Sequence, residues 1–219
     1  MMIARLIMIV AALSVSAEIG AQNVLDRFTA AVKSHCVSFS YTYSQKSDAP
    51  VKAVGTIQVQ GNAYILKGNG LEVWCDGRNR WTADVKAKEL AVETVETDGD
   101  GSDALNPALI VGSLENHFRV ASSGSTVNAE GKKLYRFVLT PQKSLMDIAS
   151  LTVFFDEYGY ADSKGVSYPV IERAVFKMKD GTSEEFEIHS MSFFGKVEQT
   201  DFAFDMKRAD PSWIVSDMR

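Results

Sequence analysis

Residues 37–45 read Val-Ser-Phe-Ser-Tyr-Thr-Tyr-Ser-Gln, and this stretch decides the fold. Aromatic residues alternate in it with small hydroxyl residues, so its hydrophobic period is two. That period is typical of a β-strand with one face on a core and the other in water, because successive side chains of a strand point to opposite sides. We expect the core to lie on the face that carries Phe39, Tyr41 and Tyr43.

Further segments of this character follow, and tight turns separate them. The dipeptides Gly61-Asn62, Asp76-Gly77 and Asp180-Gly181 are typical of β-hairpins. Consecutive antiparallel strands with one apolar face curl and must cover that face. The chain is therefore expected to be α+β and mainly β, with a curved antiparallel sheet that forms an open half-barrel of about 11 strands. The expected strands are residues 37–45, 54–60, 63–67, 71–75, 80–84, 90–95, 118–121, 134–140, 151–156, 170–177 and 184–193, with an edge strand from 202–205 and 213–215.

Two helices are expected to cover this sheet. The first ends near Ser34 and places Val24, Leu25, Phe28, Ala31 and Val32 on one face. The second begins at Asn106-Pro107, since Asn is a good N-cap and Pro suits the first helical position. It is so apolar that it must lie on an apolar surface, and we expect it to be a lid across the concave face. Its lid candidates are Pro107, Leu109, Ile110, Val111 and Leu114.

The N-terminus has the pattern of a secretory signal peptide. Arg5 precedes an apolar run at residues 6–15, and small residues follow. A bilayer span needs about 20 residues, so the run is too short to cross one. We expect residues 1–21 to be the signal peptide, with cleavage after Ala17 or Ala21, and 22–219 to be a single domain. The alternatives are an uncleaved anchor and a buried helix.

Composition and motifs exclude several function classes. The net charge of −5 argues against a nucleic-acid binder, because phosphate contacts need clustered Lys and Arg. The three histidines are scattered, and there is no Gly-x-Ser-x-Gly or phosphate-binding Gly-rich motif. The acidic segment 98–103 lacks the ligand spacing of an EF-hand. We therefore expect no catalytic residues, no metal and no cofactor, and an envelope hydrolase is disfavoured.

The chain has two cysteines, Cys36 and Cys75. Exported proteins commonly pair their cysteines, so these two are a candidate disulfide. Its loop-closure contribution would be about 4 kcal/mol. The alternative is two buried thiols.

Large apolar side chains share faces of the expected strands and are candidates to line a cavity. An ordinary side-chain-filled core is the alternative for each of them, but a curved sheet of this size often encloses a cavity. The candidates are Tyr64, Leu66, Trp74, Trp81, Tyr135, Phe137, Leu139, Leu151, Val153 and Phe155.

The order of the motifs resembles the periplasmic outer-membrane lipoprotein carriers, the LolA-like family. Phe39-Ser-Tyr-Thr-Tyr-Ser-Gln45 is similar to the family's Phe-x-x-x-Phe-x-Gln, and Gly55-Thr-Ile-Gln-Val-Gln60 to its Gly-x-hydrophobic strand. Asp76-Gly-x-x-x-Trp81 resembles the Asp-Gly-x-x-Trp turn with one extra residue. The Asn106-Pro107 helix stands where the family has its lid, and Phe202-Ala-Phe204 fits its tail.

The resemblance covers nearly the whole mature chain and implies a periplasmic carrier. Its cargo would be the acyl chains of lipoproteins or other lipids, held in a hydrophobic cavity and moved towards the outer membrane. Transient partners at the inner and outer membranes are implied, and we expect a monomer, whose mouth stays free. The family has an Arg after the Gly-x-hydrophobic strand that latches the lid, but this chain reads Gln60-Gly-Asn-Ala-Tyr64 there. A non-enzymatic envelope scaffold or interaction domain on the same fold is the alternative function.

Overall fold

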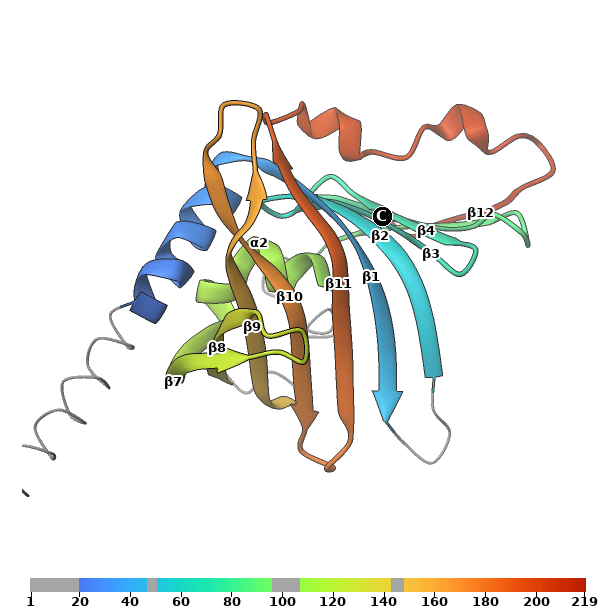
Figure 1. Cartoon of the computed structure of the whole chain (residues 1–219). Coiled ribbons are helices and arrows are strands. Elements are labelled where there is room, and N and C mark those ends of the chain that lie inside the picture. The colour runs from blue at the N-terminus through green and yellow to red at the C-terminus, as the bar shows by residue number, and fades with distance from the viewer. Residues whose placement is uncertain (1–19, 47–50, 96–106, 143–147) are drawn as a thin grey trace, which may run out of the picture.

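The computed structural model describes residues 20–46, 51–95, 107–142 and 148–219. They form one strongly curved open sheet whose concave side holds two helices (Figure 1). This is the mainly β half-barrel that the period-two segments predicted. The strands are β1 Cys36–Lys46, β2 Val51–Gln60, β3 Ala63–Gly68, β4 Leu71–Cys75, β5 Asn79–Asp84, β6 Glu89–Thr94, β7 Phe118–Val127, β8 Lys133–Pro141, β9 Ile148–Ala161, β10 Ser167–Met178, β11 Ser183–Phe194 and β12 Ile214–Asp217.

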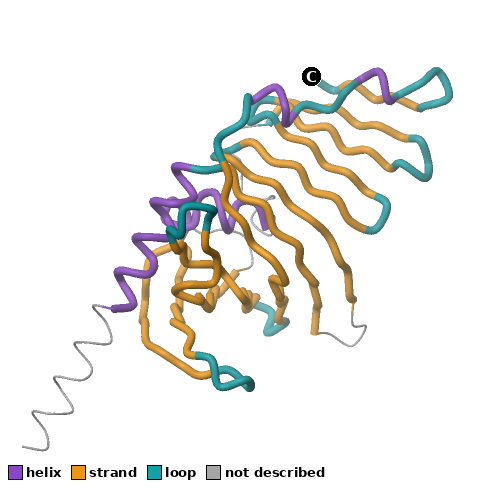
Figure 2. Tube along the Cα trace, turned by 45° about the horizontal axis from the view of Figure 1, so that its top comes forward, coloured by secondary structure: helices purple, strands orange, loops and turns teal. Residues whose placement is uncertain are grey.

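The strand order is β12-β6-β5-β4-β3-β2-β1-β11-β10-β9-β8-β7. Neighbours pair antiparallel except β12, which pairs parallel with β6. Two meanders, β1 to β6 and β7 to β11, therefore join through the pairing of β1 with β11, which runs from Cys36 opposite Phe194 to Lys46 opposite Ser183. Figure 2 shows that the sheet stays open between its two ends.

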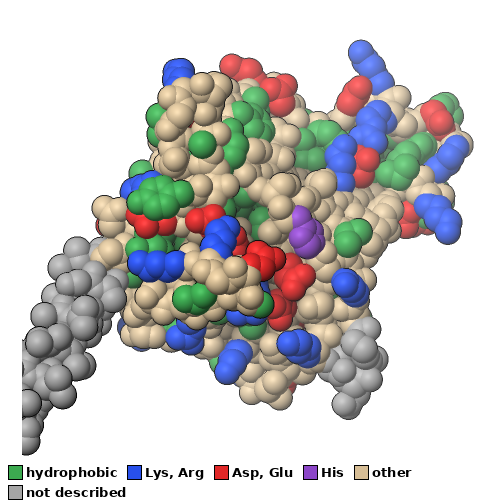
Figure 3. All heavy atoms as spheres, in the orientation of Figure 1, with side chains coloured by type: hydrophobic (Ala, Val, Ile, Leu, Met, Phe, Trp, Pro, Cys, Tyr) green, Lys and Arg blue, Asp and Glu red, His purple; other side chains and the backbone are tan. Residues whose placement is uncertain are grey.

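The alternation of β1 separates the two faces of the sheet as expected. Val37, Phe39 and Tyr41 are buried in the main apolar cluster on the concave side. The outer side carries hydroxyl groups, and there Thr42 Oγ1 lies 2.7 Å from His189 Nε2. Figure 3 shows charged side chains gathered over this outer face, with a histidine beside them.

The N-terminal helix (residues 20–34) and α2 (Pro107–His117) lie against the concave side. The predicted apolar stripe of the first helix is confirmed, since Val24, Phe28, Ala31 and Val32 are buried and Leu25 is partly buried. No helix among the described residues is long and apolar enough to span a membrane.

A C-terminal segment covers part of the outer face. It contains the 3-10 turns η1 (Gln199–Phe202) and η2 (Met206–Arg208) and ends in β12. Gln60 fastens its start, because the side-chain amide donates to the Val197 carbonyl at 3.0 Å and accepts from the Val197 N–H at 3.0 Å. The tail thus contributes β12 as an edge strand, whereas residues 202–205, predicted to be part of one, form turns.

The predicted disulfide is wrong, because both cysteines are free thiols in the structure. Cys75 lies opposite Tyr64, Tyr64 lies opposite Val59, and Val59 lies opposite Val37 of β1, so Cys75 points to the same side as Val37. Three strand spacings, about 14 Å along the sheet, separate β4 from β1. Cys36 directly precedes Val37 in β1 and points to the outer face, where it packs with Ala63 and Phe202. A disulfide needs Cα atoms within about 7 Å on a shared side. The alternative of two buried thiols holds.

Both thiols should therefore react with a thiol reagent only after unfolding. Burial raises the pKa of the Cys36 thiol and so disfavours its reactive thiolate. Labelling with and without denaturant, read by intact mass, should give no label on the folded protein and two labels on the unfolded one. A bridge would instead appear as the loss of two hydrogens in the mass of the protein purified without reductant.

Signal cleavage should occur after Ala17 rather than after Ala21. Ala21 is fully buried in the main cluster and Gly20 lies against Tyr135, so cleavage after Ala21 would remove part of a packed helix. The intact mass of the exported protein should place its first residue at Glu18. A first residue of Gln22 would contradict this prediction.

Candidate functional site

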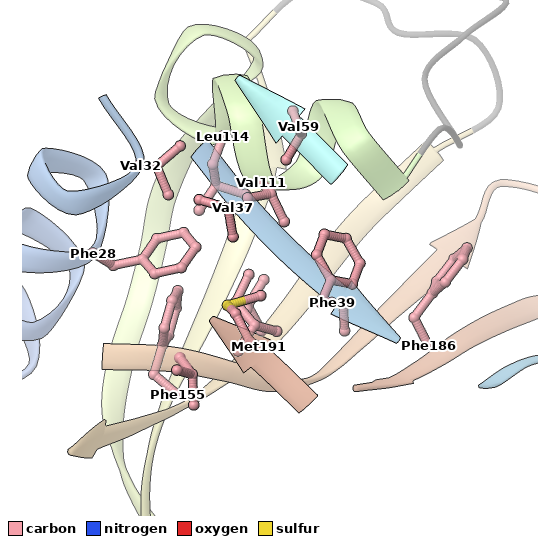
Figure 4. Close-up of a cluster of buried hydrophobic side chains, with 14 of the residues drawn as sticks. Phe28, Val32, Val37, Phe39, Val59, Val111, Leu114, Phe155, Phe186 and Met191 are labelled. Atoms are coloured by element: carbon pink, nitrogen blue, oxygen red, sulfur yellow. The ribbon is translucent and has the colours of Figure 1, made fainter. Parts of the chain in front are cut away.

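The concave face of the half-barrel is the candidate site, and it is apolar except for one buried carboxyl. Most of the predicted cavity residues meet there in one buried cluster, and Leu66 packs against its margin. Phe28 of the N-terminal helix reaches this face, with its ring centroid 5.0 Å from that of Phe155, and Phe155 lies 5.5 Å from Phe137 (Figure 4). The predicted residues found in the cluster are Tyr64, Tyr135, Phe137, Leu139, Leu151, Val153 and Phe155.

Trp74 and Trp81 do not belong to this face, which corrects their prediction as cavity residues. They pair across β4 and β5 and point to the outer side, where Trp81 forms a second cluster with Leu90, Val92 and Phe204. The C-terminal segment covers them there. Trp74 packs edge-on against Phe204, with ring centroids 6.3 Å apart.

The lid helix begins at Pro107, as predicted. Val111 and Leu114 are buried and point between the N-terminal helix and the sheet (Figure 4). The side chains of the other lid candidates, Pro107, Leu109 and Ile110, lie outside the described residues.

Gly112 brings α2 against the β2–β3 turn. A Cβ built on Gly112 would lie 2.7 Å from the Gly61 carbonyl oxygen and 3.4 Å from Val59 Cγ2. Gly112 therefore permits a close backbone approach. Gly61 lies in the segment where the family resemblance placed a latching Arg. Here the turn meets the lid by backbone contact.

Polar ties fix the C-terminal end of α2. Lys33 of the N-terminal helix forms an ion pair with Glu115, and both side chains are largely exposed. Gln142 donates its side-chain amide to the carbonyls of Glu115 and Phe118, at 2.8 and 2.9 Å. Its backbone N–H donates to the His117 carbonyl at 2.8 Å. Carbonyls that a helix end leaves unpaired are satisfied in this way.

A groove of about 200 Å³ opens between the N-terminal helix, the end of α2 and the first residues of β7. A smaller hollow of about 30 Å³ lies between the two helices. The sequence predicted Leu114 and Leu139 as site residues but not the other apolar residues that line the groove. Those residues belong to separate elements that come together only in the fold. The groove is lined by Gln22, Leu25, Asp26, Thr29, Leu114, Glu115, Phe118, Val120 and Leu139.

One buried carboxyl interrupts the apolar face. Glu184 precedes Phe186 by two residues in β11, so both point to the concave side, and Glu184 is only 7% exposed. Burial raises the pKa of Glu184, and a hydrogen bond from Tyr43 partly opposes that shift. Burial, and then the Glu184 carboxylate, raise the pKa of Tyr43 to about 12.

The described residues contain no group of three or more His, Cys, Asp or Glu that could hold a metal ion. The histidines lie apart. His35 Nδ1 is 2.9 Å from the Ala31 carbonyl at a helix end, His117 ends α2, and His189 meets Thr42 on the outer face.

No family model and no curated protein matches the sequence. Among solved structures, the chain is similar to an uncharacterized conserved protein from Thermus thermophilus, with a TM-score of 0.50 and 10% identity over 90% of this chain and 99% of that one. A DUF1329 family protein from Desulfovibrio piger gives a TM-score of 0.48 at 9% identity, covering 85% and 97% of the two chains. A LolA superfamily protein from Nitrosomonas europaea gives 0.46 at 11% identity, covering 84% and 97%. The likeness is one of fold alone, and it is the fold that the chain shares with the Thermus thermophilus protein.

Gly112→Ala should destabilise the protein, although Ala in a helix interior normally stabilises it by about 1 kcal/mol over Gly. The added Cβ would press on the Gly61 carbonyl, which is backbone and cannot turn away. We expect a loss of about 1–3 kcal/mol in the free energy of unfolding by urea. Gly124→Ala is the matched control, because nothing lies within 4 Å of its Cβ position. A stabilised Gly112→Ala protein would show that α2 does not press on this turn.

Glu184→Gln should stabilise the protein at neutral pH. The raised pKa means that the folded state binds the Glu184 proton more tightly than the unfolded state does. The stabilisation that comes from this tighter proton binding is fully present below the ordinary Glu pKa of about 4.3. It is lost as pH rises through the pKa of Glu184 in the folded state. Gln keeps an acceptor for Tyr43 without the buried charge.

Urea unfolding from acid to neutral pH measures this effect. The advantage of Glu184→Gln over the native protein should grow as pH rises and vanish in acid. Glu187→Gln, at an exposed position on the same strand, controls for the loss of one charge. A constant difference at every pH would contradict the prediction.

Proposed function

We propose that this protein is an exported, non-enzymatic carrier of acyl chains, either on lipoproteins or on other lipids. One observation supports this most directly: a groove lined by five apolar and four polar or charged side chains opens beside the helices that cover an apolar concave sheet. Sites for apolar ligands combine apolar walls with a few polar groups that orient the ligand. The proposed cargo-contacting residues are Leu25, Leu114, Phe118, Val120 and Leu139 at the groove and the predicted concave-face residues beneath the helices.

The energetics require that the helices separate when cargo enters. Each buried CH₂ of an acyl chain is worth about 0.8 kcal/mol, so a long chain needs an extensive apolar surface. The groove of about 200 Å³ lies below the usual range of ligand pockets, about 300–1,000 Å³. Movement of α2 away from Phe28 and Val32 would join the groove to the smaller hollow and uncover the concave face.

The attachment of α2 is compatible with such movement. Its polar tie to the N-terminal helix is the exposed Lys33–Glu115 pair, and exposed ion pairs contribute about 0–1 kcal/mol. Apolar contacts of Val111 and Leu114 hold the rest of this interface. Cargo that replaces these contacts with its own would offset most of the cost of opening.

The setting of this function is the periplasm, with the signal peptide, expected within residues 1–21, removed by cleavage after Ala17 and the rest of the chain forming one domain. The carrier would receive cargo at the inner membrane and deliver it to the outer membrane through transient partners. It would act as a monomer and without a cofactor. The leader pattern around Arg5 and the family resemblance support this setting.

A scaffold or interaction domain is the second candidate, and the dense packing of the concave face favours it. Phe137, Phe155 and Phe176 are fully buried beneath the helices. A permanently filled interior would leave the groove as a surface feature. Native mass spectrometry of the protein from its own envelope fraction separates the two functions, because a carrier should retain an acylated peptide or lipid that is released on denaturation.

Val120→Asp should weaken binding of a fluorescent N-palmitoyl peptide about tenfold, because it places a charge on the apolar groove wall. Val120 is 40% exposed, so the variant should fold. Val54→Asp is the matched control on β2, 60% exposed and outside the groove lining, and it should bind as the native protein does. Absence of saturable binding by the native protein would reject the carrier and favour the scaffold.

A further inference from the structure

The outer edge of β7 offers unpaired backbone groups next to the groove. β7 ends the strand order and, among the described residues, pairs with β8 alone. It is ten residues long, whereas β12 at the opposite edge has four. In an antiparallel ladder, alternate residues direct their N–H and C=O away from the partner strand. Residues 122–127 therefore present about three such pairs of groups outward.

This edge has few of the features that normally prevent strand addition. Natural edges are protected by short strands, Lys, Pro or bulges. β7 has a register irregularity at Ala121, but residues 122–127 beyond it read Ser-Ser-Gly-Ser-Thr-Val, without a charge or a proline. Gly124 has open space at its Cβ position. Among the described residues this edge can therefore pair with another extended chain. Its small side chains place few restrictions on the sequence of that chain.

The groove determines which chain would lie there. Phe118 and Val120, at the start of β7, form part of the groove wall. An acyl chain bound in the groove would leave its attached group beside the open part of the same strand. If that group is a peptide, its main-chain amides are complementary to the unpaired groups of β7.

We propose that β7 binds the extended peptide next to an acylated residue as an additional strand of the sheet, while the acyl chain lies in the groove. This inference rests on the proposed carrier function and names its substrate class as acylated peptides rather than free lipids. Main-chain hydrogen bonds supply affinity that does not depend on which side chains the peptide carries. One carrier can therefore accept acylated proteins of different sequence.

The test compares three probes on the native protein. The first is an N-palmitoyl hexapeptide of polar residues, the second a palmitoyl amide without peptide, and the third the acylated hexapeptide with alternate amides N-methylated. The third probe is made in two versions, each N-methylated at one of the two alternate sets of amides. The hexapeptide should bind about tenfold more tightly than the simple amide. One methylated set should lose this gain and the other keep it, because only one set faces β7.

Hydrogen exchange provides a second readout. The outward-facing amides among residues 122–127 should become protected with the acylated hexapeptide and not with the simple amide, and β12 at the other edge should not change. Equal affinity for the hexapeptide and the simple amide would overturn the strand-addition proposal and leave the carrier function intact. Equal losses from both methylated sets, or a protein dimer held through β7 at the probe concentrations, would also overturn it. Failure of every acylated probe to bind would reject the carrier function itself.

Discussion

The structure depends on one constraint: the apolar concave face of a curved, open sheet must be shielded from water. The sheet does not close on itself, so its strands cannot bury this face alone. The N-terminal helix and α2 bury it instead, with Phe28 against Phe155 and Val111 beside Val32. Every feature of the candidate site follows from this arrangement, because the groove lies where the two helices and the edge strand meet.

The two helices of the cover are attached to the rest of the structure at different points. The N-terminal helix is tied to the sheet by Phe28 and by Arg27, whose guanidinium donates to Glu157 at 3.2 Å and to the Ser167 carbonyl at 3.1 Å. α2 is fastened at its C-terminal end through Gln142 and meets the β2–β3 turn through Gly112. Together the two helices keep the apolar face from water, since an exposed apolar face promotes association.

Period-two alternation and helix signals were sufficient to predict the sheet, both helices and most of the concave face. They failed for Trp74 and Trp81, because β4 carries apolar residues on both faces, the apolar face of β5 is the outer one, and alternation does not say which face is concave. The C-terminal segment that covers these tryptophans comes from a distant part of the chain. The disulfide failed for a related reason, since only the pairing register shows that Cys36 and Cys75 point to opposite sides. The groove was missed because Leu25 and Val120 meet only in three dimensions.

The pairing of β1 with β11 also governs the order in which the chain can fold. These strands lie next to each other in the sheet, yet β11 ends at Phe194, near the end of the chain. Closing such a long loop has an entropic cost that precedes the gain from the contacts, so folding is slow for sheets of this kind. Until β11 has formed, one edge of β1 has no partner and its aromatic face has only part of its cover. If the chain is exported as proposed, it needs protection from aggregation during translocation, before it can protect any cargo of its own.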